Sequence, residues 1–344
     1  MTEGRTTSEG RQVGAYITRV LAGMAQGLFA SLIIGLIIKQ IGHYSSIQLL
    51  EHIGMVAQYL TGPAIGMGVA IAVGASPLGV LGSAVAGAVG AGTFSFANGI
   101  SLALGEPVGA MVAGLAAAES SKRVAGKTDV DILIVPLATI LVGSLVGYFI
   151  APPIAALMSY IGAFINSLTT LYPLPMGILV SAVVGMVLTL PISSAAICIS
   201  LGLDGLAAGA AVVGCSCQMV GFAVSSYKEN RLGGLISQGL GTSMLQIPNI
   251  WRNPRIWIPP TLTAAILGPI STMVFRMENN SAGAGMGTSG LVGQFNAIAV
   301  MGLEAWPVVL LMHFLLPAML SLTFSTIMRK RGWIKDGDML LSLH

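Results

Sequence analysis

The stretch AYITRVLAGMAQGLFASLIIGLIIKQI (residues 15–41) is almost wholly apolar. A helix needs about 20 such residues to cross the hydrocarbon of a bilayer. This run is too long for the core of a signal peptide, and no cleavage-type tail follows it. Arg19 lies near its start, where a long side chain can extend its charge to the interface. We therefore predict a permanent membrane-spanning helix.

The rest of the chain has the same chemistry. Hydrophobic residues make up 54% and charged residues 8% of the 344, and the mean hydropathy is +0.85. A soluble domain carries about 25% charged residues, so a soluble globule of this composition could not cover its surface. We predict an all-α, polytopic transmembrane bundle of about eight to ten spans. The candidate spans are 15–41, 53–73, 77–98, 131–151, 175–202, 205–226, 257–276 and 304–328.

Three stretches do not fit a simple span. Residues 100–121 are interrupted by glycine and proline, 152–170 begin with two prolines and resemble an interfacial helix, and 277–302 are too glycine-rich for a helix. Non-helical backbone at membrane depth is tolerated only where it is buried in protein or lines a cavity. We therefore expect re-entrant hairpins. A weak likeness between 60–70 and 266–275 suggests an internal repeat, as in many transporters.

Basic residues set the expected topology. Clusters occur at Lys122/Arg123/Lys127, Lys228/Arg231, Arg252/Arg255 and Arg329/Lys330/Arg331/Lys335. The positive-inside tendency places several of these loops and the C-terminus of this multi-pass membrane protein in the cytoplasm. We divide the chain into a polar tail (1–12), one transmembrane domain (13–330) and a cytoplasmic tail (331–344).

Glu106 is the most informative charge. It lies in SLALGEPVGAM (101–111), between Gly105 and Pro107. Gly105 and Pro107 can end one segment and begin a helix, with the proline in the first turn, where its missing N–H costs little. A carboxylate inside the membrane costs roughly 2.5–3.5 kcal/mol even on the most favourable scale. We expect Glu106 to accept hydrogen bonds from a solute; the alternative is an interfacial helix cap.

Three other ionisable residues are candidates for a proton or polar relay. Asp204, in SLGLDGLAAG, is more typical of a turn and helix N-cap. Glu304, in MGLEAWPVVLL, is more typical of an interfacial first turn. His313, in LLMHFLLP, lies in the middle of an apolar span, where a lone histidine more often bonds a neighbouring helix.

The stretch GAGMGTSGLVGQFN (283–296) predicts a ligand-lining hairpin. Its glycines allow close approach to the backbone, and its side chains are neutral donors and acceptors, which suit an uncharged polar solute. The candidate binding residues are Gly285, Gly287, Thr288, Ser289, Gln294 and Asn296, joined by Asn98 and Gln218 from other apolar runs. The alternative is close helix packing through small residues.

The sequence gives little support for metal binding or catalysis by this chain. Cys198, Cys215 and Cys217 lie in apolar segments, and no histidine lies near them in sequence, so we interpret them as packing residues and predict no metal site. We find no catalytic triad and no P-loop, and we predict no cofactor, no catalytic residue and no nucleic-acid partner.

Two segments carry a family resemblance. NPRIWIPPTLTAAILGPISTMVFRMENNSAGAGMGTSGLVGQ (253–294), with GEPVGAMVAGLAAAE (105–119), resembles the EIIC-like membrane proteins of the bacterial phosphotransferase system. Within this family the chain resembles the group containing the perfringolysin O regulator protein, and the resemblance covers residues 13 to 330 or so.

The resemblance implies a permease for a sugar or similar polar solute in the bacterial inner membrane, a homodimer, and a separate EIIB protein that phosphorylates the sugar. It also implies an intramembrane glutamate near the sugar, which local context matches to Glu106, although the better-known EIIC glutamate motif is not intact. We recognise no EIIA or EIIB domain within residues 1–344, so we expect this chain to be at most the membrane subunit of an enzyme. Two alternatives stay open: a secondary transporter without phosphorylation, and a membrane sensor.

Overall fold

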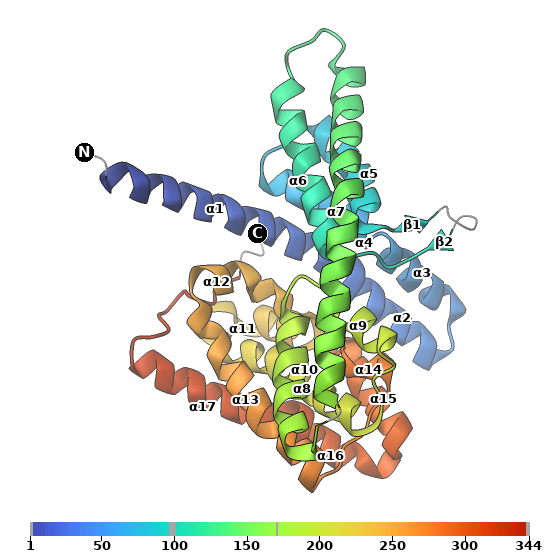
Figure 1. Ribbon diagram of the computed structural model, residues 1–344, viewed down its shortest axis with the longest axis vertical. Helices are drawn as coiled ribbons and strands as arrows, with labels where there is room; N and C mark the ends of the chain where they lie inside the picture. The colour runs from blue at the N-terminus through green and yellow to red at the C-terminus, as the bar shows by residue number, and fades with distance from the viewer. Residues whose placement is uncertain (1–2, 96–100, 170, 342–344) are drawn as a thin grey trace. The chain divides into compact units, whose positions relative to one another are not determined.

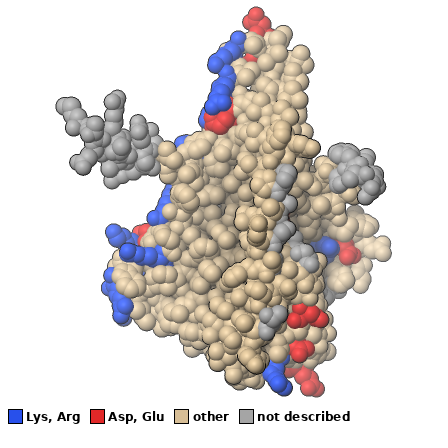
Figure 2. All heavy atoms as spheres, viewed as in Figure 1, with Lys and Arg blue, Asp and Glu red and all other residues tan. Residues whose placement is uncertain are grey.

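The computed structural model describes residues 3–95, 101–169 and 171–341, and these divide into two compact units (Figure 1). The first unit comprises Met1–Ala155 and the second Ala156–Ser342. Nearly all described residues are helical, which confirms the predicted all-α class. On the face drawn in Figure 2, uncharged residues cover most of the surface and charged side chains gather in small patches.

The first unit is built from consecutive helices and one short antiparallel strand pair, in which Phe94 pairs with Leu102 and Ser95 with Ser101. Its elements are α1 (Glu3–Leu28), the π-helical turn η1 (Phe29–Ile33), α2 (Ile34–Ser45), α3 (Gln48–Tyr59), α4 (Thr61–Ala72), α5 (Pro77–Ala91), β1 (Phe94–Ser95), β2 (Ser101–Leu102) and α6 (Pro107–Val124). The boundary between the units falls inside α7 (Asp131–Thr169).

Small residues let the helices of the first unit approach closely. A Cβ added at Gly90 of α5 would overlap the backbone oxygen of Gly109 in α6, and the reverse is also true. Such contacts replace the hydrophobic driving force that helices lack in lipid. A polar cluster adds to them on the outside: Glu119 of α6 accepts from Tyr16 Oη of α1 at 2.5 Å and from Lys122 Nζ at 2.7 Å.

The second unit packs around α10 (Gly205–Ser225), which is almost entirely buried. Its further α-helices are α8 (Pro173–Thr189), α9 (Ser194–Ser200), α11 (Tyr227–Ile236), α12 (Ile247–Arg252), α13 (Ile258–Pro269), α14 (Ser281–Ala284), α15 (Val292–Met301), α16 (Trp306–Leu310) and α17 (Leu316–Lys330). Its short 3₁₀ or π segments are η2 (Ser237–Gly241), η3 (Ser243–Gln246), η4 (Pro254–Trp257), η5 (Ile270–Val274), η6 (Ser289–Leu291), η7 (Leu303–Ala305) and η8 (Leu311–Leu315).

Membrane-length helices are fewer than the eight candidate spans. Within the described residues, five helices are long and apolar enough to cross a bilayer: Val13–His43, Asp131–Ile150, Gly205–Ser225, Pro254–Val274 and Leu303–Lys330. A sixth is obtained if α3 and α4, which meet at 52°, are counted as one broken span. Pro77–Ala91 and Pro173–Thr189 are apolar but shorter, because each ends at a break that the hydropathy pattern alone does not reveal.

Two expectations about breaks are wrong. We expected a new helix at Pro152–Pro153, but α7 runs continuously through both, since proline keeps a helical φ and each proline removes a single backbone donor. We expected no helix in 277–302, but its second half forms α15. The glycines concentrate before Val292, so only the first half is irregular.

The tail after α17 folds back onto the second unit. Met339 is fully buried, and its backbone oxygen accepts from Asn230 Nδ2 at 2.8 Å and Gln246 Nε2 at 3.1 Å. Asn249 Nδ2 donates to the Leu340 oxygen at 2.9 Å. Hydrogen bonds from buried amides thus fix this tail segment on the second unit, whereas its composition suggests a free tail.

Candidate functional site

Gln294 and His313 form a buried polar pair in the second unit. Gln294 is on α15, His313 on η8, and Gln294 Nε2 lies 2.9 Å from His313 Nδ1. His313 is fully buried and Gln294 is 4% exposed. The same amide nitrogen lies 3.5 Å from Ser216 Oγ of α10, a hydroxyl that itself donates to the Val212 oxygen at 2.8 Å. Three segments far apart in sequence therefore meet at this pair.

The local sequence explains why His313 lies on a π-helical turn. The Leu316 N–H donates to the oxygen of Leu311, five residues earlier. Pro317 follows, has no N–H, and its ring clashes with the carbonyl four residues before it, which belongs to His313. The helix widens here, and π-turns of this kind are frequent at functional sites.

Both side chains keep one polar atom without a partner among the described residues: Gln294 Oε1 and His313 Nε2 are buried and unbonded. Because an amide nitrogen only donates, His313 Nδ1 must accept and the imidazole proton lies on Nε2. The pair therefore offers one unused donor and one unused acceptor. If the amide is turned over, the roles exchange and the count is the same.

The glycine-rich hairpin before α15 packs against α10 and η2. Thr288 Oγ1 donates to the Gly239 oxygen at 2.5 Å, and Ser289 Oγ donates to the Gly241 oxygen at 2.8 Å. Gly287 has φ +52°, and a Cβ there would lie 2.8 Å from the Cys215 carbonyl carbon. These contacts favour the packing interpretation for this part of the stretch.

Gly285 and Asn296 also have protein partners. The Gly285 oxygen accepts from Ser194 Oγ at 2.7 Å. Asn296 Nδ2 donates to the Val292 oxygen at 2.9 Å, and its Oδ1 accepts from Asn280 at 3.0 Å. The hairpin thus satisfies most of its own polar groups, and Gln294 is the member with spare capacity.

Gln218 of α10 is the centre of a second buried network. Its Oε1 accepts from Trp257 Nε1 at 3.1 Å and from Thr189 Oγ1 at 3.3 Å, and its Nε2 donates to Thr261 Oγ1 at 2.9 Å. Sequence reasoning did not connect these partners, because they lie 29 to 43 residues away. Trp257 and Thr261 also line an open, largely apolar cavity of about 420 Å³.

Glu106 belongs to the first unit. It precedes α6 as its N-cap residue, with Pro107 in the first turn as predicted, but its side chain makes no capping hydrogen bond. Its backbone N–H donates to the Ala91 oxygen at 2.9 Å, and its Oε2 is buried. The hydroxyl of Thr93, also buried, has no partner among the described residues, and a Cβ at Gly105 would lie 3.2 Å from it.

The other candidates lie apart from these groups. Asp204 occupies the N-cap position of α10 and Glu304 lies in η7, and both are exposed. Cys215 and Cys217 are fully buried, and Cys215 Sγ contacts the Val184 oxygen at 3.7 Å. Asn98 lies outside the described residues.

A sequence profile of the family described as "Phosphotransferase system, EIIC" matches residues 18–341. No curated protein matches the chain. No solved structure matches it either. The profile match covers both units and, together with the apolar spans, shows a multi-pass membrane protein: the chain belongs to the EIIC family of the phosphotransferase system.

Proposed function

We propose that the protein is a bacterial inner-membrane permease for a sugar or similar uncharged polyol, acting as an EIIC subunit with a separate EIIB protein. The family match supports this class of transport. In the proposal the chain binds and moves the solute, and EIIB supplies the phosphate. The homodimer implied by the family stays a prediction.

The observation that carries the proposal is the unsatisfied pair. A buried polar atom without a partner costs about 1–3 kcal/mol, so two adjacent ones need a reason. Gln294 Oε1 and His313 Nε2 together present an acceptor and a donor, and a sugar hydroxyl both donates and accepts. In either orientation of the amide an anion would meet one unpaired acceptor, the amide oxygen or the imidazole nitrogen, so the pair favours a neutral, hydroxylated solute.

The burial of the pair implies a transport cycle. His313 is fully buried, so a solute reaches it only after the helices around α15 and η8 move. Alternating access in transporters consists of such rocking around a central site. Gln218, at the centre of its own network in the second unit, is proposed as a further solute contact. Glu106 of the first unit is a separate candidate, tested by itself below.

The test is solute binding by the purified protein in detergent, read as a rise in melting temperature across hexoses, hexitols, disaccharides, sugar acids and nucleobases. The central variant is Gln294→Leu/His313→Leu, which removes both polar groups. Removing a whole unsatisfied pair is expected to leave stability near wild type, because no buried partner is left unpaired. We expect a sugar or hexitol to stabilise the wild type and not this variant.

Asn296→Ala is the matched control, because Asn296 lies on the same helix but bonds within the hairpin. It should keep sugar binding even if it lowers stability. Glu106→Gln is tested in parallel, with loss of at least tenfold in affinity expected for a carboxylate that accepts a sugar hydroxyl. If the leucine variant binds sugar as well as the wild type, the pair is structural; if only non-sugars bind, the proposed substrate class is wrong.

A further inference from the structure

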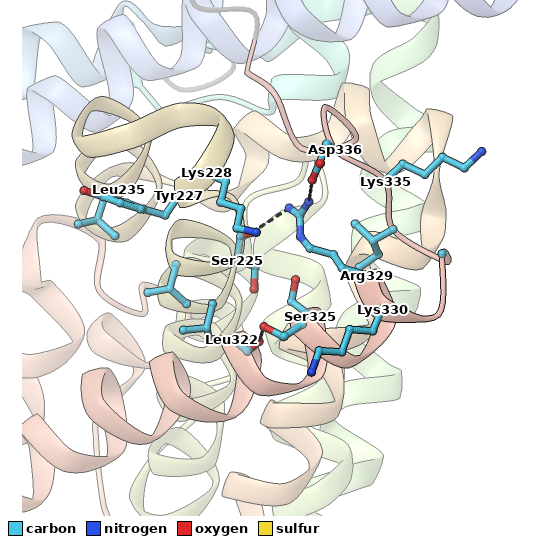
Figure 3. A pocket seen from close by; sticks show the side chains of 14 residues that line it. Ser225, Tyr227, Lys228, Leu235, Leu322, Ser325, Arg329, Lys330, Lys335 and Asp336 are labelled. Atoms are coloured by element: carbon cyan, nitrogen blue, oxygen red, sulfur yellow. Dashed lines mark hydrogen bonds and ion pairs between the residues drawn. The ribbon is translucent and has the colours of Figure 1, made fainter.

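A cavity that does not include Gln294 or His313 lies where two membrane-length helices end. It has a volume of about 820 Å³ and is formed by the last residues of α10, by α11, by the end of α17 and by the tail after it (Figure 3). Both Gly205–Ser225 and Leu303–Lys330 end at its walls. The cavity therefore lies at the level where spans leave the hydrocarbon.

The wall of the cavity is apolar and its opening is basic. Val224, Leu235 and Leu322 form part of the wall. Four of the lining residues are basic (Lys228, Arg329, Lys330 and Lys335) and one is acidic (Asp336), which gives a net charge of +3. Lys228 comes from α11 and Lys330 from the end of α17, and Lys335, in the tail, points away from the other labelled side chains (Figure 3). All three lysines are exposed.

Arg329 pairs with two acids at the cavity, Glu229 and Asp336, and a third acid nearby, Asp338, accepts from Asn253 Nδ2 and the Lys335 N–H. Arg329 Nη2 lies 2.7 Å from Glu229 Oε1, and Arg329 Nη1 lies 3.1 Å from Asp336 Oδ1. Among the described residues, the three lysines have no ion pair. The lining residues together with Glu229 carry a net charge of +2, and the three lysines are its unpaired cations among the described residues.

Two further features point to an amphiphilic ligand at a membrane surface. Tyr227 lines the cavity and is 41% exposed, and Trp333, between two lining residues, is 44% exposed with Arg331 5.5 Å over its ring. Exposed tyrosine and tryptophan are enriched at the headgroup level of a bilayer. Inside, Ser325 Oγ is buried, lines the cavity, and has no partner in the described part of the chain.

From this arrangement we propose that the cavity binds an anionic glycerophospholipid, with its phosphate between Lys228 and Lys330 and the upper part of an acyl chain against Leu235 and Leu322. Basic pockets between transmembrane helices on the cytoplasmic side suit anionic headgroups. The basic loops place this end of the unit on that side by the positive-inside tendency. A soluble anion would leave the apolar wall uncovered, so the lipid is favoured.

The experiment titrates the full-length protein in non-ionic detergent with dioctanoyl phosphatidylglycerol, measuring affinity by calorimetry and the shift in melting temperature. We expect saturable binding that weakens as NaCl is raised, because the attraction is electrostatic. Dioctanoyl phosphatidylcholine should bind at least tenfold more weakly. Lys228→Gln/Lys330→Gln should weaken phosphatidylglycerol binding about 20-fold.

Two matched variants separate the site from general surface charge. Arg252→Gln/Arg255→Gln removes two exposed cations of the same unit outside the cavity and should bind like wild type. Lys228→Arg/Lys330→Arg keeps both charges and should bind phosphatidylglycerol like the wild type, unlike the glutamine variant. Equal loss in both glutamine variants, or none in the cavity variant, overturns the proposal. Inorganic phosphate or glycerophosphoglycerol matching the lipid would also overturn it, because the acyl chain would then contribute nothing.

Discussion

At the scale of single residues, similar glycines have different roles. Gly287 has φ +52° and lies against the backbone of Cys215, whereas a Cβ at Gly233 of α11 would meet nothing within 4 Å. Positive φ is a conformation that glycine adopts freely and alanine does not. Both residues are glycine in the sequence, and only their packing and backbone conformation show which one cannot become alanine without strain.

The first prediction follows from this contrast. Gly287→Ala should lower the free energy of unfolding by about 2–4 kcal/mol, since it adds backbone strain to an overlap with α10. Gly233→Ala should be neutral or stabilise by up to about 1 kcal/mol, because alanine is the better helix former. Thermal or denaturant unfolding in detergent measures both. A stable Gly287→Ala protein that fails to bind sugar would instead support the ligand-lining interpretation.

At the scale of elements, the last span is not a uniform helix. It consists of η7, α16, η8 and α17, and its π-helical turn contains His313. Pro317 explains the turn, and the turn sets the direction in which the imidazole points toward Gln294. A proline and a histidine four residues apart are thus coupled through backbone geometry.

Pro317→Ala tests that coupling. The new N–H can donate to the His313 oxygen, so the helix regains its α register and His313 moves away from Gln294. We expect unliganded stability at or above wild type, together with loss of sugar-induced stabilisation. Pro307→Ala is the control, because Pro307 lies in the first turn of α16, where its missing donor matters little. Unchanged sugar binding in Pro317→Ala would show that the turn does not position the histidine.

At the scale of the whole molecule, each unit has its own packing, and the second unit includes the tail. Ile334 is 2% exposed and Met339 is fully buried, and the amides of Asn230, Gln246 and Asn249 bond the tail backbone. Polar networks of this kind stabilise when every member is satisfied. The tail is thus part of the folded unit.

Met339→Ala should therefore destabilise the protein by about 2–5 kcal/mol, the range for truncating a buried methionine. The neighbouring Leu340 is 53% exposed, and Leu340→Ala should stay within about 0.5 kcal/mol of wild type. Chemical denaturation of the two variants side by side gives the comparison. Equal effects would mean that the tail does not pack on the second unit in solution.

The sequence by itself showed that the chain lies in a lipid bilayer, and this environment decides the class of fold. Long apolar runs and few charges require membrane-spanning helices, because in hydrocarbon the backbone N–H and C=O groups can hydrogen-bond only within the protein. Local chemistry also placed the break at Gly105–Pro107, since turn conformation depends on neighbouring residues. It also singled out Gln294, His313 and Gln218, because polar side chains within apolar runs need hydrogen-bond partners.

Only the tertiary structure decided which of these groups meet. Gln294 and His313 are 19 residues apart with a turn between them, and Gln218 finds its partners 29 to 43 residues away. Periodicity says which side chains need hydrogen bonds but not which helix supplies them, because that depends on packing between distant segments. The buried tail and the basic cavity at the end of α17 escaped prediction for the same physical reason: both depend on contacts that no local pattern encodes.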